Sequence, residues 1–170
     1  MSMLKNLSLL SLLALTLVGC GFQLRGEAQL PPGMQRVIVV SADAFSPLKR
    51  NLEDSLRRSG ATVEEKSGDG IAELKLPVVT ISPEVSSVGI AQHVREFVMV
   101  YHVELEVVNS EGKIIVPKQT VELTRDFTFD DTQALGIGVE QDELKRQMQR
   151  DMVQSVMRRI EAVGKSAAAH

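Results

Sequence analysis

Apolar and polar residues alternate along two stretches in the second half of the chain, residues 96–107 and 121–129. The apolar positions of the first stretch are Phe97, Met99, Tyr101, Val103, Leu105 and Val107, and those of the second are Val121, Leu123, Phe127 and Phe129. Successive side chains of a strand point to opposite faces, so this period of two predicts two half-buried strands. The segment Asn109-Ser110-Glu111-Gly112 between them is rich in turn-forming residues and predicts a hairpin.

Shorter patterns before the hairpin predict a strand, a helix and a second strand. Residues 36–41 contain the β-branched run Val37-Ile38-Val39-Val40, which is typical of a strand buried on both faces. Ser46-Pro47 indicates a helix start, with serine as the N-cap and proline at the first helical position. Leucines follow at Leu48, Leu52 and Leu56. Ser59-Gly60 predicts the helix end, and residues 61–65 a strand that completes a βαβ-like unit.

Two further elements complete the predicted fold. Residues 73–81 favour a strand in which Pro77 indicates an edge position or a bulge. Residues 139–163 predict a long helix, closed by Gly164. Its apolar stripe is Leu144, Met148, Met152, Val156, Ile160 and Val163. The methionines Met148, Met152 and Met157 are interpreted as core residues, although methionine also suits adaptable interfaces. These elements predict an α/β (α+β) sandwich, in which a mostly antiparallel or mixed sheet of about four strands is covered by two helices.

The N-terminus predicts secretion and lipid attachment. Lys5 precedes an apolar run that is too short for a membrane-spanning helix, which takes roughly 20 residues. The run ends in Leu17-Val18-Gly19-Cys20, a bacterial lipobox, so cleavage after Gly19 and acylation of Cys20 are expected. The alternative is an ordinary signal peptide followed by a chance cysteine. Gly21, rather than aspartate, after the cysteine resembles the pattern sorted to the outer membrane. Several acyl chains would hold the protein there on the periplasmic side.

The predicted boundaries are a signal peptide at residues 1–19, a lipidated tether at 20–33, one domain at 34–164 and a flexible tail at 165–170. The mature chain of about 150 residues is large enough for a single core. The formal net charge of the whole chain is −3, and loss of Lys5 makes the mature form more acidic, which argues against nucleic acid as a partner. Cys20 is the single cysteine, so no disulfide framework and no thiolate nucleophile are expected.

Catalytic and metal-binding patterns are weak. The histidines, His93, His102 and His170, lack metal-ligand spacing, and no serine lies in a nucleophile elbow. We therefore expect no enzymatic activity, no metal and no cofactor. Glu104 and Glu106 alternate on one strand face, where a solvated or partner-facing surface is favoured over a catalytic pair.

Arg95 and Arg125 share the apolar faces of Phe97 and Phe127. If the hairpin pairs in matched register, the two arginines are expected to lie close together at the end away from the turn. One interpretation is pairing with Asp130, Asp131 or the acidic start of the last helix. The other is an anionic ligand site, because guanidinium groups bind phosphate bidentately.

The segment Cys20-Gly21-Phe22-Gln23-Leu24-Arg25-Gly26 resembles the start of mature proteins of the LptE family of lipopolysaccharide-assembly lipoproteins. The order of predicted elements and the segments Asp131-Thr132-Gln133-Ala134 and Glu140-Gln141-Asp142 are similar as well. The resemblance covers essentially the whole mature chain and implies a small α/β sandwich. It further implies a plug inside the outer-membrane β-barrel LptD, which helps that barrel to assemble and delivers lipopolysaccharide to the outer leaflet.

One part of the family pattern is missing. In the family, basic residues implicated in lipopolysaccharide binding lie before the long hairpin and before the last helix. Here these segments read Val88-Gly89-Ile90-Ala91 and Ala134-Leu135-Gly136-Ile137-Gly138, without lysine or arginine. Either direct binding of lipopolysaccharide is weak, or Arg95 and Arg125 provide it.

The candidate barrel contacts are Glu104, Glu106, Asn109 and Gly112. Two other functional classes stay open beside the LptE-like role. One is a generic periplasmic lipoprotein that binds a small ligand or inhibits an enzyme. The other is a lipid-anchored hydrolase, which is disfavoured because no nucleophile with a base is visible.

Overall fold

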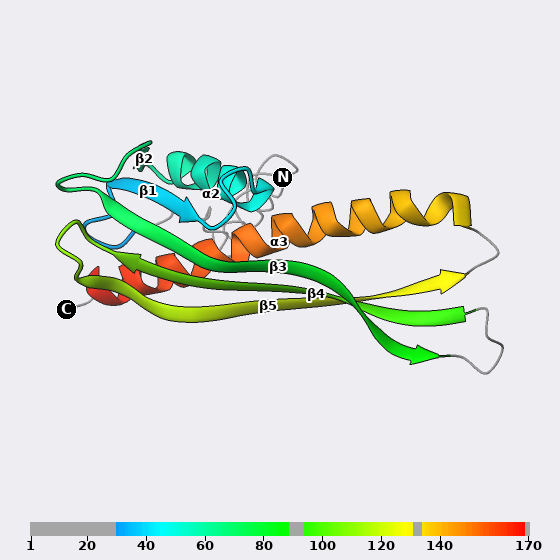
Figure 1. The fold of residues 1–170 in the computed structure, drawn as a ribbon. Helices are drawn as coiled ribbons and strands as arrows, with labels where there is room; N and C mark the ends of the chain where they lie inside the picture. Colours follow the sequence, from blue (N-terminus) through cyan, green and yellow to red (C-terminus); the bar gives the residue numbers. More distant parts are fainter. Residues whose placement is uncertain (1–29, 89–93, 131–133, 169–170) are drawn as a thin grey trace, which may run out of the picture.

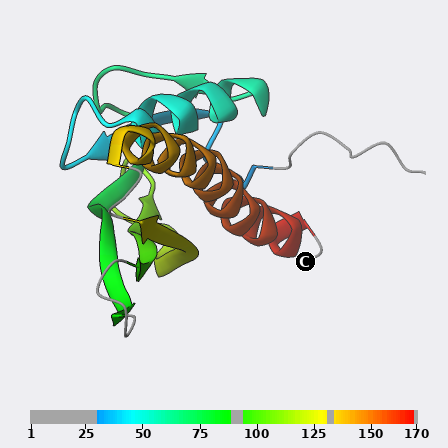
Figure 2. The same ribbon diagram turned by 90° about the vertical axis from the view of Figure 1, so that its right-hand side faces the viewer.

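A computed structural model describes residues 30–88, 94–130 and 134–168. The described residues form a five-stranded mixed sheet with two helices on one face (Figures 1 and 2). In chain order the elements are β1 (Arg36–Ser41), α2 (Pro47–Arg58), β2 (Thr62–Val63), β3 (Ala72–Val88), β4 (Val94–Val108), β5 (Ile114–Asp130) and α3 (Ala134–Ala168). The strands lie in the order β2-β1-β3-β4-β5, so the predicted fold class is confirmed, with a very short β2 at one edge.

The βαβ unit has the predicted helix boundaries. Ser46 is the N-cap of α2 and Pro47 occupies its first turn, and the three leucines of the helix are fully buried. The Ser46 side chain makes no capping hydrogen bond and is itself buried. After the helix, Gly60 adopts a φ of 87°, a left-handed conformation that glycine accepts without a steric penalty. β2 then pairs in parallel with β1, as the unit requires.

The prediction that β1 is buried on both faces is wrong. Val37 and Val39 are buried against the helices, whereas Val40 on the other face is 41% exposed. A parallel strand is buried on both sides when helices cover both faces of its sheet. Here both helices contact the same face, since α2 packs on α3 as well as on β1. The β-branched run therefore reflects a strand preference and not two-sided burial.

β3 is the central strand for its first five residues and an edge strand afterwards. Its parallel pairing with β1 ends at Leu76, and the antiparallel register with β4 shifts between Lys75 and Val78. Pro77 lies at this irregularity, where the strand needs no backbone donor. The prediction of a bulge or an edge is thus confirmed, although β3 continues to Val88, beyond the predicted end at residue 81.

The hairpin of β4 and β5 forms around the predicted turn. Asn109 Oδ1 accepts hydrogen bonds from the backbone amides of Glu111 at 3.0 Å and Lys113 at 2.7 Å. Gly112 adopts a φ of 78°, which completes the turn. The register pairs Phe97 with Phe127, and the rings stack with centroids 5.3 Å apart. Phe97 and Phe127 therefore lie directly opposite each other in the hairpin.

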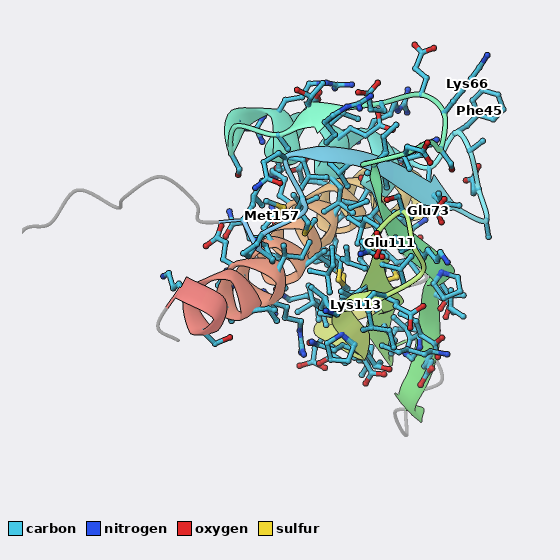
Figure 3. All side chains as sticks on the ribbon, turned by 90° about the vertical axis from the view of Figure 1, so that its left-hand side faces the viewer. Phe45, Lys66, Glu73, Glu111, Lys113 and Met157 are labelled. Atoms are coloured by element: carbon cyan, nitrogen blue, oxygen red, sulfur yellow. The ribbon has the colours of Figure 1, made fainter. Side chains whose placement is uncertain are left out.

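α3 crosses the hairpin on its apolar side and closes the core. Met148, Met152, Val156 and Ile160 are almost fully buried, and the role of Met157 as a core residue is confirmed at 6% exposure (Figure 3). The prediction that Gly164 ends the helix is wrong, because the helix continues through Gly164 to Ala168, so that residues 165–168 are helical. Glycine lowers helix stability by about 1 kcal/mol but does not by itself terminate a helix. Within the described residues, none of the helices is both long enough and apolar enough to cross a membrane.

Candidate functional site

The sheet face opposite the helices is mostly polar, with Val40, Val98 and Val100 among its apolar residues, and the described helices leave it uncovered. On β4, the odd-numbered residues from Met99 to Val107 point into the core, so the even-numbered residues point outward. His102 lies opposite Glu122 on this outer face, with 3.4 Å between its Nδ1 and the Glu122 carboxylate. A sheet with one solvated face is typical of antiparallel strands, and here that face is available to a partner.

Glu104 and Glu106 lie on this outer face, as their alternation predicted, but they are not fully exposed. The Glu104 side chain is 22% exposed and forms an ion pair with Lys118, with 2.7 Å between Glu104 Oε2 and Lys118 Nζ. The hydrogen bond and the charge of Glu104 raise the pKa of Lys118. Glu104 pairs with Thr120 in the β4–β5 register, so Lys118 lies two residues along β5 on the same face and reaches Glu104 diagonally.

Carboxylates outnumber ammonium groups on this outer face of the described strands β3, β4 and β5. By strand register, the acidic positions are Glu73, Glu84, Glu104, Glu106, Glu122 and Asp126, and the basic ones are Lys75 and Lys118. Lys75 pairs with Glu73 at 3.5 Å. The face consequently has a negative charge that favours a partner surface carrying basic or hydrogen-bond-donating groups.

The turn that joins β4 and β5 is a rigid, exposed tip. Besides the Asn109 side-chain contacts, the Gly112 amide donates to the Asn109 carbonyl at 3.0 Å. Glu111 and Lys113 project from this end of the sheet (Figure 3). Asn109 is half-buried and Gly112 is exposed, and the hydrogen bonds of Asn109 fix the backbone shape that the tip offers to a neighbour.

The expectation that Arg95 and Arg125 lie close together is wrong. The β4–β5 register pairs Arg95 with Phe129 and Arg125 with Met99, which leaves the Phe97–Phe127 pair between the two arginines. In an antiparallel pair, residues at equal distance from the turn are opposite each other. Arg95 is opposite Phe129, which is four residues, or about 13 Å along the strand, from Arg125. The side chain of Arg95 lies outside the described residues.

Arg125 contacts an acidic residue of the last helix. Its Nη2 donates to Asp151 Oδ2 at 3.0 Å, and its Nη1 donates to the Thr124 carbonyl at 3.1 Å. Arg125 therefore pairs with an acidic residue of the protein, as one interpretation predicted. The partner, Asp151, lies in the middle of α3 and not at its acidic start. Both side chains of the pair are about half exposed, so this guanidinium retains access to solvent.

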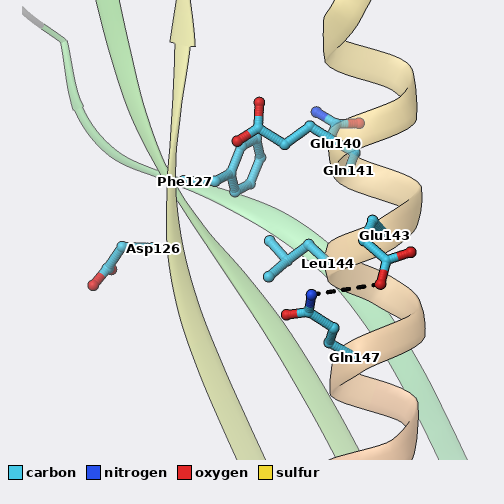
Figure 4. A pocket seen from close by; sticks show the side chains of 7 residues that line it. All are labelled: Asp126, Phe127, Glu140, Gln141, Glu143, Leu144 and Gln147. Atoms are coloured by element: carbon cyan, nitrogen blue, oxygen red, sulfur yellow. Dashed lines mark hydrogen bonds between the residues drawn. The ribbon is translucent and has the colours of Figure 1, made fainter.

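A cleft opens between β5 and the first third of α3, next to the aromatic pair. Phe127 and Leu144 face each other across it, and the Glu140 side chain reaches back toward the Phe127 ring (Figure 4). Gln141, Glu143 and Gln147 line the helix side. Its volume of about 440 Å³ falls within the roughly 300–1,000 Å³ of small-molecule sites.

The charge of this cleft does not suit a phosphate. Hydrogen bonds from Arg146 and Gln147 lower the pKa of Glu143, which keeps that carboxylate ionised. With Glu140 nearby, the rim is acidic over an apolar floor. Sequence reasoning placed Phe97 and Phe127 correctly on one apolar face but did not find the cleft, because the cleft depends on how far α3 diverges from the sheet.

Several predicted features lie outside the described residues. These are the cleavage position Gly19, the lipidation position Cys20 and the segments 89–93 and 131–133. In the part of the chain that the structure describes, no group of three or more histidine, cysteine, aspartate or glutamate side chains is arranged to hold a metal ion.

Comparisons with known proteins agree with this architecture. The model of the LptE family, described as lipopolysaccharide-assembly, matches residues 34–160. The chain is 31% identical over 157 residues to the LPS-assembly lipoprotein LptE of Yersinia enterocolitica, covering 89% of this chain and 73% of the relative. The protein of the same name from Yersinia pestis is 31% identical over 153 residues, with the same coverage.

Solved structures share the fold. Lipoprotein B from Nitrosomonas europaea superposes with a TM-score of 0.72 at 27% identity, covering 88% of this chain and 96% of that one. A minor lipoprotein from Acinetobacter baumannii has a TM-score of 0.64 at 17% identity, over 76% of this chain and 92% of its own, which shows a common fold. With a family model matching most of its length and relatives above 30% identity, this chain belongs to the LptE family of lipopolysaccharide-assembly proteins.

Proposed function

We propose that this protein plugs an LptD-type outer-membrane β-barrel, helps that barrel to assemble and takes part in delivering lipopolysaccharide to the outer leaflet. The observation that carries the proposal is the uncovered polar face of the sheet in a chain of the LptE family. Large outer-membrane barrels have polar interiors, so a domain seated in one needs a polar surface that matches the lumen. The outer face around Glu104 and Glu106 and the tip from Asn109 to Gly112 are the proposed lumen contacts.

We propose in addition that Cys20 is acylated after cleavage behind Gly19 and that the lipid holds the domain at the periplasmic side of the outer membrane. Relatives with the same fold are named lipoproteins, and the sequence carries the lipobox. Two or more acyl chains give stable anchoring, which a single chain does not.

Arg125 and Arg95 stay the proposed contacts for lipopolysaccharide in this role. Arg125 supports the assignment through its half-exposed guanidinium, whose five donors are only partly used by Asp151 and Thr124. No catalytic activity is proposed for the protein. A generic periplasmic lipoprotein that binds a small ligand is the second candidate, favoured by the cleft between Phe127 and Leu144.

The deciding experiment is affinity purification of the full chain from membranes in mild detergent, combined with photo-crosslinking. Probes at Glu122 on the outer face and at Glu111 in the tip should capture a large barrel in a one-to-one complex, whereas a probe at buried Met157 serves as the control. Depletion of the protein should leave the barrel misassembled. Purification without any barrel, together with normal surface lipopolysaccharide after depletion, contradicts the proposal and favours the second candidate.

A further inference from the structure

A second concave surface lies on the helix layer, away from the sheet. It is a groove between α2 and α3, about 310 Å³ in volume, whose floor is the buried Val153. Asn51, Asp54, Ser55 and Arg58 line it from α2, and Arg150 and Gln154 line it from α3. We call this set the interhelix groove.

The groove follows from the helix period. Residues four apart on a helix lie on the same face, one turn above each other. Asn51 and Ser55 form such a row on α2, and Arg150 and Gln154 form one on α3. Their short or flexible polar side chains do not fill the space between the two helices above Val153. The two rows therefore face each other across a groove whose walls are rich in hydrogen-bond donors.

The two arginines of the groove, Arg58 and Arg150, use only some of their N–H donors in the hydrogen bonds that the structure shows. Arg58 Nη2 donates to Ser55 Oγ at 2.8 Å, a neutral partner on its own helix. Arg150 Nη2 contacts Glu143 Oε1 at 3.4 Å, which is long for a charge-assisted hydrogen bond. Glu143 is held more tightly by Arg146, at 2.9 Å. A guanidinium offers five N–H donors, so both arginines can turn toward a ligand in the groove without losing a short ion pair.

The acidic residue of the groove is already neutralised. Arg57 Nη1 donates to Asp54 Oδ1 at 3.0 Å, from the turn next to Arg58. Because Asp54 is paired with Arg57, Arg58 and Arg150 give the groove a positive local charge. Basic residues also outnumber acidic residues on α2 as a whole, where Lys49, Arg50, Arg57 and Arg58 stand against Glu53 and Asp54.

We propose that the interhelix groove binds a phosphate group, with the guanidiniums of Arg58 and Arg150 on opposite walls. The Ser55 hydroxyl accepts from Arg58 and can donate its own hydrogen to a phosphate oxygen, and the Asn51 and Gln154 amides supply further donors. Arginine forks match phosphate oxygens in pairs, which lysine does not. The acidic cleft near Phe127 and the acidic outer face of the sheet cannot provide this chemistry. The site does not depend on the proposed barrel partner.

The test uses the full chain in detergent at low ionic strength, with inorganic pyrophosphate as the probe and NMR shifts of arginine Nε–H groups as the readout. Arg58→Gln and Arg150→Gln should each weaken binding at least about threefold, and together about tenfold or more, as expected for exposed charged contacts. Lys49→Gln and Lys145→Gln are matched controls, because each removes one charge from the same helix without lining the groove or pairing with Asp54 or Glu143. They should change affinity less than twofold.

The source of the phosphate is resolved by two further titrations. Lipid A micelles and enzymatically dephosphorylated lipid A are added to the same samples. Shifts of Arg58 and Arg150 with lipid A but not with its dephosphorylated form identify a lipid headgroup as the ligand, and shifts with pyrophosphate alone identify a soluble phosphate. Absence of saturable shifts at these two arginines with any phosphorylated probe overturns the proposal, and so does equal weakening by the control substitutions.

Discussion

Arg125 on β5 and Asp151 on α3 form a hydrogen-bonded ion pair with 3.0 Å between Nη2 and Oδ2, which ties the distal half of the hairpin to the long helix. Both side chains are about half exposed, so solvent screens the pair. We expect Arg125→Ala to lower the free energy of unfolding by no more than about 1 kcal/mol. Urea denaturation measures this change.

Substitutions at the two residues of this pair distinguish a ligand-binding role of Arg125 from a structural one. If Arg125 contacts lipopolysaccharide phosphates, Arg125→Ala should weaken binding of lipopolysaccharide several-fold. Asp151→Ala, which breaks the same pair but frees the guanidinium, should leave binding unchanged or strengthen it. Equal weakening by both variants indicates that the pair acts through structure, and no effect of either excludes Arg125 from the ligand site.

Tyr101 gives a direct test of core burial. Desolvation raises its pKa from 10.0 to about 12, and it is 2% exposed. The pKa of Tyr101 is higher in the folded state than in the unfolded state. The contribution of its neutral phenol to the free energy of unfolding is therefore complete below about pH 10 and declines as pH rises from there toward 12. The loss should amount to about 2–3 kcal/mol.

The measurement uses the fact that Tyr101 is the single tyrosine of a chain without tryptophan. Ultraviolet absorbance of tyrosinate should rise near pH 12 in the native protein and near pH 10 in urea. Tyr101→Phe removes the signal and should reduce the alkaline loss of stability. A native titration near pH 10 would mean that the phenol is hydrated.

Two glycines should respond to alanine with opposite signs. Gly112 has a φ of 78° in the hairpin turn, and an added Cβ would meet no atom, so the cost is backbone strain. We expect Gly112→Ala to destabilise the fold by about 1 kcal/mol. Gly138 lies within α3 with open space around it, and Gly138→Ala should stabilise the fold by about 0.5–1 kcal/mol. Thermal unfolding of the two variants, measured side by side, tests both signs.

The stacked pair of Phe97 and Phe127 should couple the two strands. Their rings lie 5.3 Å apart with planes at 16°, and Phe127 also lines the cleft below α3. A double-mutant cycle with Phe97→Leu and Phe127→Leu should give a coupling energy of about 0.5–1.5 kcal/mol. Coupling near zero would show that each ring packs independently against the helix.

Lipidation of Cys20 is tested by mass spectrometry of the mature N-terminal peptide. We expect three acyl chains on Cys20, with residues 1–19 removed. Cys20→Ser should leave the protein unlipidated and release it from membranes that lack the barrel. An unmodified cysteine in the wild-type protein contradicts the anchor.

The sequence predicted correctly the elements that depend on neighbouring residues, namely β1, α2 and the hairpin turn. Residues 36–41 match β1 to the residue, Ser46-Pro47 and Ser59 bound α2, and the Asn109–Gly112 turn sets the register that stacks Phe97 on Phe127. In each of these cases the residue type acts on its own backbone or on its neighbour across a tight turn. The alternating faces of β4 and β5 were predictable for the same reason.

Features that depend on distant parts of the chain were missed. The exposure of Val40 depends on both helices sharing one face of the sheet. The Lys118–Glu104 pair is a diagonal contact across two strands, and the groove with Arg58 and Arg150 depends on how two helices align. None of these relations has a sequence pattern of its own. The continuation of α3 past Gly164 is a different case, because there packing of the preceding turns outweighs a weak local preference.

The place where the described chain begins limits how a lipid-anchored domain can stand on its membrane. Leu30 packs on the core, and a Cβ at Gly33 would lie 3.5 Å from Ile115, beside the hairpin tip. Cys20 and Leu30 are ten positions apart, which corresponds to at most about 35 Å of fully extended chain. α3, with 35 residues, extends about 52 Å along the domain. In the proposed lipidated protein this tether is shorter than the domain, so the domain cannot invert on the membrane, and the hairpin tip stays within about 35 Å of the bilayer.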